Sequence, residues 1–89
     1  MKYRSRADII AMILRAASNG ATKTRIMYGA YLSHSQVRDY LDFMTGRNLL
    51  ILDEATGEYR LTESGIRVLR TYEGISEMIS VGVKEKPLA

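Results

Sequence analysis

Residues 21–44, ATKTRIMYGAYLSHSQVRDYLDFM, contain two short helical patterns separated by the interruption GAYLS at residues 29–33. The second pattern opens with Ser33, and Gln36 follows three residues later. At this spacing a serine caps a helix N-terminus while the glutamine side chain bonds back to the amide of the cap. The sequence therefore predicts a break at a defined position, with two helices held at a fixed angle by a tight turn.

The composition of the 89-residue chain limits its size class and its chemistry. One small domain is expected, and the thin core of such a domain favours support from a partner chain. Because cysteine is absent, a disulfide scaffold, thiol catalysis and cysteine-ligated zinc are excluded. No apolar run approaches the ~20 residues of a membrane span, and the start of the chain lacks the apolar stretch of a signal peptide. We expect a soluble, cytoplasmic protein.

Basic residues are concentrated in the first third of the chain. Residues 1–30 carry six Lys or Arg and one Asp, whereas residues 31–62 carry three basic and five acidic residues. The net charge of the whole chain is only +3. A localised basic face is typical of nucleic-acid-binding proteins. Charge scattered for solubility is the alternative interpretation.

Three helices are predicted in the first half of the chain. Ser5 and Asp8 form a capping box before the first, which ends at Asn19 and Gly20. Thr22 caps the second, and the expected second and third helices cover residues 23–28 and 34–47.

A hairpin and a fourth helix are predicted in the second half. The apolar run at residues 49–52, followed by Gly57 and by alternation at Tyr59 and Leu61, indicates two antiparallel strands. A fourth helix, capped by Thr62, follows at about residues 62–80. It carries a 4-3-4 seam that suits a partner helix, and the alternative is that part of this seam covers the domain's own core: Val68, Tyr72, Ile75 and Ile79. Gly74 within it costs ~1 kcal/mol relative to alanine. We expect a domain at residues 1–80 with a C-terminal dimerisation helix, and a flexible tail at residues 81–89.

This order predicts a mainly α fold with a small β-hairpin, a winged helix-turn-helix followed by a C-terminal helix. The segments KTRIMYGAYLS, YLDFM, LLIL and YRLTESG resemble the small archaeal winged-helix DNA-binding proteins, which include dimeric chromatin-associated members. The resemblance covers roughly Ser5 to Leu69. It implies binding to double-stranded DNA without enzymatic activity, and a homodimer formed through the last helix as an antiparallel coiled coil.

The outer face of the third helix is a candidate for contact with DNA bases. On a helical wheel, Val37, Leu41 and Met44 face the core. The opposite face and its flanks present His34, Ser35, Gln36, Arg38, Asp39 and Asp42. Arginine makes bidentate contacts to guanine, so Arg38 and Gln36 are the strongest candidate readers. A solvated helix face has the same composition and stays open as the alternative.

The start of the second helix is a candidate for contact with DNA phosphates. Two hydroxyls and two cations gather there: Thr22, Lys23, Thr24 and Arg25. A helix N-terminus favours an anion, although Thr22 acting only as a cap, with solvated cations, is the alternative. Arg60 on the hairpin is a candidate wing contact. Tyr28 and Tyr31 flank the turn and either pack it or hydrogen-bond a phosphate.

Patterns typical of catalysis are absent from the sequence. The single histidine, His34, lies between Ser33 and Ser35, but consecutive helical residues point in different directions. Neither a Gly-rich phosphate loop, a metal-ligand cluster nor a paired-carboxylate site has the required spacing. We expect no enzyme, no metal and no cofactor. The predicted function is a DNA-binding transcriptional regulator or nucleoid-associated chromatin protein, and the alternative is a protein-interaction module with the same fold.

Overall fold

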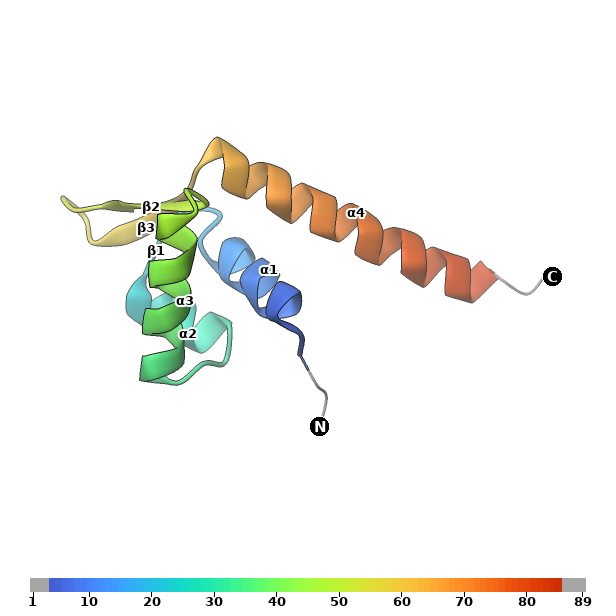
Figure 1. Cartoon of the computed structure of the whole chain (residues 1–89), viewed down its shortest axis with the longest axis horizontal. Coiled ribbons are helices and arrows are strands. Elements are labelled where there is room, and N and C mark those ends of the chain that lie inside the picture. The colour runs from blue at the N-terminus through green and yellow to red at the C-terminus, as the bar shows by residue number, and fades with distance from the viewer. Residues whose placement is uncertain (1–3, 86–89) are drawn as a thin grey trace.

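The protein is described by a computed structural model that covers the backbone of residues 4–85 and the side chains of residues 4–79. Its elements are α1 (Arg6–Ala16), β1 (Ala21–Thr22), α2 (Lys23–Gly29), α3 (His34–Gly46), β2 (Leu50–Asp53), β3 (Glu58–Leu61) and α4 (Glu63–Glu85). The strands form one antiparallel sheet in the order β1-β3-β2. Figure 1 shows the β2–β3 hairpin and the C-terminal end of α4 at opposite ends of the molecule. The predicted winged helix followed by a C-terminal helix is confirmed.

All four predicted helix starts are confirmed by hydrogen bonds to the capping side chains. The capping residues are Ser5, Thr22, Ser33 and Thr62, and each accepts from the amide three residues later. Ser5 and Ser33 complete the reciprocal bonds of a capping box. These contacts lie within single turns, which is why the local sequence was sufficient to predict them.

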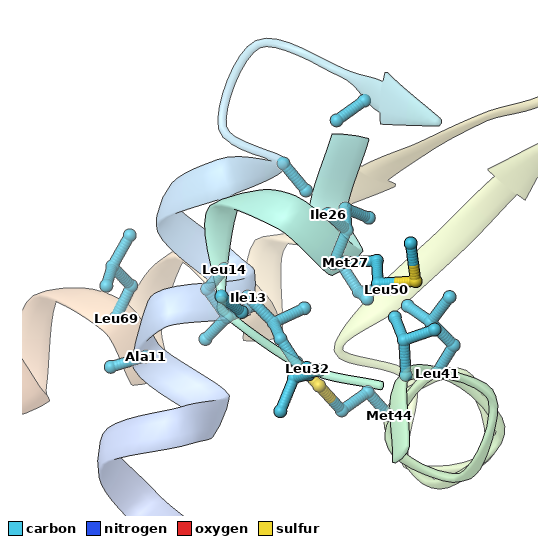
Figure 2. Close-up of a cluster of buried hydrophobic side chains, with 14 residues drawn as sticks. Ala11, Ile13, Leu14, Ile26, Met27, Leu32, Leu41, Met44, Leu50 and Leu69 are labelled. Atoms are coloured by element: carbon cyan, nitrogen blue, oxygen red, sulfur yellow. The ribbon is translucent and has the colours of Figure 1, made fainter. Parts of the chain in front are cut away.

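The core is built by α1, α2, α3 and β2, with a single buried hydrophobic side chain from the described part of α4, Leu69. Figure 2 shows most of these side chains converging between the three short helices, while Leu69 lies apart from them, near Ala11 on α1. The least exposed large side chains are Ile13, Leu14, Ile26, Val37, Met44 and Leu50. Leu41 is also buried, so the predicted inner face of α3 is confirmed. α4 is therefore attached to the domain through its first half.

The first turn of α4 sits directly on the chain that joins α3 to β2. The Thr62 hydroxyl donates to Asn48 O at 2.6 Å, and the Thr62 amide donates to Leu49 O at 3.1 Å. A Cβ atom on Gly65 would lie 2.1 Å from Leu49 O, well inside van der Waals contact. Because any side chain would collide with this backbone, glycine is required where the two segments meet.

The fourth helix is longer than the sequence predicted. It continues through Gly74 to Glu85, so residues 81–85 are helical and do not belong to a tail, while residues 86–89 lie outside the described residues. A glycine penalty of ~1 kcal/mol is too small to end a helix of this length. At ~1.5 Å per residue the 23 residues span about 35 Å. Figure 1 shows the first half of α4 running alongside α1 and its second half extending away from the fold.

No helix within residues 4–85, α4 included, combines the length and apolar character needed to cross a membrane.

Candidate nucleic-acid interface

The predicted outer face of α3 is open to solvent. His34, Ser35, Gln36, Arg38, Asp39 and Asp42 are all exposed. The Gln36 side chain is already engaged, because its Oε1 accepts from the Ser33 amide at 2.9 Å. Arg38 Nε lies 3.6 Å from Asp39 Oδ1, with 61% and 74% of the two side chains exposed. A pair this exposed contributes little free energy, so Arg38 can exchange its partner for another.

The cations at the start of α2 are also exposed. Among the described residues, no ion pair involves Lys23 or Arg25. Thr22 is committed as the cap, with its Oγ1 3.2 Å from the Arg25 amide, and Thr24 is exposed beside it. Since α2 has only seven residues, we attribute the positive potential here to the two side chains and not to the helix dipole.

The cations that the structure describes in the first third of the chain do not form a single free basic surface. Arg4 hydrogen-bonds to the α2–α3 turn. The Arg6 guanidinium lies 4.8 Å from the centre of the Phe43 ring, a cation–π distance. Arg15 Nε lies 3.0 Å from Glu73 Oε2. These contacts join residues far apart in the sequence, so the charge count could not reveal that three of the cations are occupied.

The wing arginine is held by acidic neighbours. Arg60 Nη2 lies 3.2 Å from Glu58 Oε1, and its Nε lies 3.9 Å from Asp53 Oδ2. Half of the Arg60 side chain is exposed. A phosphate approaching this side would compete with two carboxylates, which makes Arg60 the weakest of the candidate contacts.

The four side chains of the predicted seam on α4 lie in two different environments, three of them in solvent and one against the core. Val68, Ile75 and Ile79 are exposed by 39%, 54% and 61%. Tyr72 is half-buried against the core, and its hydroxyl donates to Asp8 Oδ1. This hydrogen bond, together with the bonds from Ser5, lowers the pKa of Asp8, and it raises the pKa of Tyr72. Tyr72 is therefore part of the α1–α4 contact, whereas the other three side chains of the seam are exposed.

Two further features complete the described surface. Met78, 70% exposed, extends the apolar face of α4 and was not singled out by the 4-3-4 spacing.

The single histidine, His34, stands at the start of α3. Within the described residues, no group of three His, Cys, Asp or Glu side chains lies close enough together to bind a metal ion.

A family model and a solved structure both match this chain over most of its length. A family model described as a winged helix-turn-helix matches residues 3–80. A crystal structure of Sso10a-2, described as a DNA-binding protein from Sulfolobus solfataricus, matches with a TM-score of 0.78 at 25% identity. The match covers 93% of this chain and 92% of that chain. No curated protein sequence matches significantly.

Proposed function

The chain belongs to the winged helix-turn-helix family, and on this premise we propose that it binds double-stranded DNA. In the proposed complex α3 lies in the major groove and the cations of α2 contact the phosphate backbone. The observation that carries the proposal is the exposure of Lys23 and Arg25 on the helix that precedes an equally exposed outer face of α3. The likeness to Sso10a-2, itself a DNA-binding protein, supports it.

The small number of base-reading side chains favours modest sequence selectivity. Arg38 is the strongest reader, because Gln36 is engaged in its cap and Asp39 and Asp42 repel phosphates. A bidentate contact contributes ~1–3 kcal/mol of discrimination, whereas a specific site typically requires ~4–10 kcal/mol. We propose a nucleoid-associated role in the cytoplasm, as a chromatin component or as a regulator that gains selectivity by using two copies.

We propose that the two copies associate through α4. The apolar side chains Val68, Ile75, Met78 and Ile79 are exposed on a helix that extends away from the domain. An apolar stripe on a projecting helix is stabilised by a partner helix, and the 4-3-4 spacing of the seam suits a second copy of the same helix. Two α3 helices at a fixed separation would then read two half-sites.

Salt dependence tests the DNA-binding proposal. Binding to random-sequence duplex is measured at several salt concentrations for the native chain and for the Lys23→Ala/Arg25→Ala double variant. Each neutralised phosphate contributes about 0.9 to the slope of log K against log salt, so the double variant should flatten the slope by about two. The loss should be the same on all DNA sequences, because phosphate contacts carry no sequence information.

Arg70→Ala is the control for loss of positive charge as such. It removes one cation from the exposed surface of α4 and should leave the slope unchanged. An unchanged slope in the double variant would remove α2 from the interface. Affinity that hardly responds to salt in the native chain would instead favour a protein-interaction module.

A further inference from the structure

The turn between α2 and α3 contains a strained tyrosine. Tyr31 has φ +56°, in the left-handed region that favours glycine. It occupies the residue after the helix cap, where the Leu32 amide donates to Met27 O at 3.0 Å and the Tyr31 amide donates to Tyr28 O at 3.3 Å. These are the two bonds of a Schellman motif, in which glycine is the usual residue at this position. A tyrosine here raises the free energy of the folded backbone.

Packing within the described protein does not offset this strain. The Tyr31 side chain is 76% exposed, and Tyr28 on the last turn of α2 is 70% exposed. Within residues 4–79 the hydroxyl of neither tyrosine takes part in a hydrogen bond. Two large aromatic side chains therefore stand in solvent beside the turn, one of them on a backbone position where a smaller residue would be more stable.

Arg4 holds the turn in this conformation. Its guanidinium donates to Ala30 O at 2.5 Å and to Tyr31 O at 3.0 Å, across 26 and 27 residues of sequence. These carbonyls lie at the end of α2, where a helix leaves acceptors without intrahelical partners. A strained residue with its own carbonyl held by a distant side chain is pre-organised, and such strain clusters at binding sites.

The position of Tyr31 places it next to the expected DNA surface. It lies two residues before Ser33, the cap of α3. In helix-turn-helix proteins the N-terminal residues of the second helix contact the base edges, with the neighbouring backbone close to the phosphates. Figure 1 shows the turn passing from the end of α2 to this end of α3.

We propose that Tyr31 contacts the sugar–phosphate backbone of duplex DNA through its hydroxyl and ring, and that Arg4 is the positioning residue that holds it there. This inference rests on the proposed DNA-binding function. It assigns a contact to a residue whose strain and exposure no contact with residues 4–79 explains.

Tyr31→Gly separates a binding role from a structural one. Glycine relieves the left-handed strain, so the variant should unfold at a higher temperature than the native chain, yet bind duplex DNA about five- to tenfold more weakly because a hydrogen bond and a ring contact are lost. Tyr31→Phe should account for the part of this loss that is due to the hydroxyl. A purely structural tyrosine would change stability and affinity in the same direction or leave affinity unaltered.

Asn48→Gly is the matched control. Asn48 has φ +60° at the end of α3, in the same kind of turn, but at the opposite end of this helix from Ser33. Its replacement should leave DNA affinity unchanged. Native affinity in Tyr31→Gly would overturn the inference while leaving the proposed function intact, whereas a native chain that does not bind DNA would overturn both.

The positioning role of Arg4 has its own readout. Arg4→Ala should weaken DNA binding while keeping the native salt slope, because the guanidinium contacts carbonyls and not phosphates. Arg4→Lys, which keeps the charge but lacks the forked donor, should weaken binding similarly. A slope reduced by about one in Arg4→Ala, restored by lysine, would overturn the positioning role and make Arg4 a phosphate contact.

Discussion

Replacing Gly65 with alanine should strongly destabilise the fold. The added Cβ would lie 2.1 Å from Leu49 O, 3.2 Å from Leu49 C and 3.5 Å from Leu14 Cδ2. The nearest of these atoms is backbone, so no side-chain rotation relieves the collision. The first turn of α4 must move away from the α3–β2 connection, and the bond from the Thr62 amide to Leu49 O is the first to be strained.

The expected loss of folding free energy in Gly65→Ala is the difference between two opposing effects. Inserting a methyl group into a packed contact costs about 1–3 kcal/mol, and the weakened hydrogen bond adds about 0.5–1.5 kcal/mol. Alanine returns ~1 kcal/mol of helix propensity relative to glycine. We expect a net loss of about 1–3 kcal/mol, which lowers the melting temperature of a domain this size by roughly 4–8 °C per kcal/mol.

Gly74→Ala in the same helix provides the matched comparison. A Cβ at Gly74 meets nothing within 4 Å, so only the propensity gain of ~1 kcal/mol applies and the melting temperature should rise. Both variants are compared with the native chain by thermal and urea unfolding at one protein concentration, because association would make the transition concentration-dependent. Equal stability of the two variants would refute the steric argument for Gly65.

Three further outcomes are expected. Tyr72→Phe should destabilise the fold at neutral pH, because it removes the hydrogen bond that lowers the pKa of Asp8 below 3.8. The difference in unfolding free energy between variant and native chain, measured by urea titration, should persist above that pH and disappear as the pH falls through the lowered pKa. Arg38→Ala should lose ~1–3 kcal/mol of discrimination at one base position per half-site in selections from random oligonucleotides, and a sharp motif that survives it would place the reading elsewhere. Ile75→Glu/Ile79→Glu should give a folded monomer by sedimentation, whereas a native chain already monomeric at high concentration would disprove association through α4.

The interactions that the sequence determined by itself lie within a few residues of one another. Ser33 and Gln36 set the restart after the GAYLS interruption, and Ser5 with Asp8 does the same for α1. Helical spacing was sufficient to identify the buried face of α3. These features are predictable because capping and amphipathic periodicity act over one or two turns, whatever the rest of the chain does.

Tertiary structure decided which of the candidate groups are free to bind. β1 has only two residues and forms because Ala21 and Thr22 pair with β3, so no local sequence pattern predicts it. The tail expected from residue 81 onward is helical up to Glu85. Contacts across long stretches of sequence engage several cations of the first third, whereas Lys23 and Arg25 stay exposed.

For the α4 seam and for the turn before α3, too, the sequence identified candidate residues and only the folded structure showed which of them are free. Spacing alone grouped Tyr72 with Ile75 and Ile79, but the Tyr72 hydroxyl meets Asp8 on α1, 64 residues away. The sequence offered two roles for Tyr31, and only the folded backbone revealed its left-handed conformation and open side chain. Local sequence determines where the helices begin, because short-range capping bonds stabilise their first turns. Which side chains remain available for a partner depends on how those elements pack, since packing brings together groups that the sequence keeps apart.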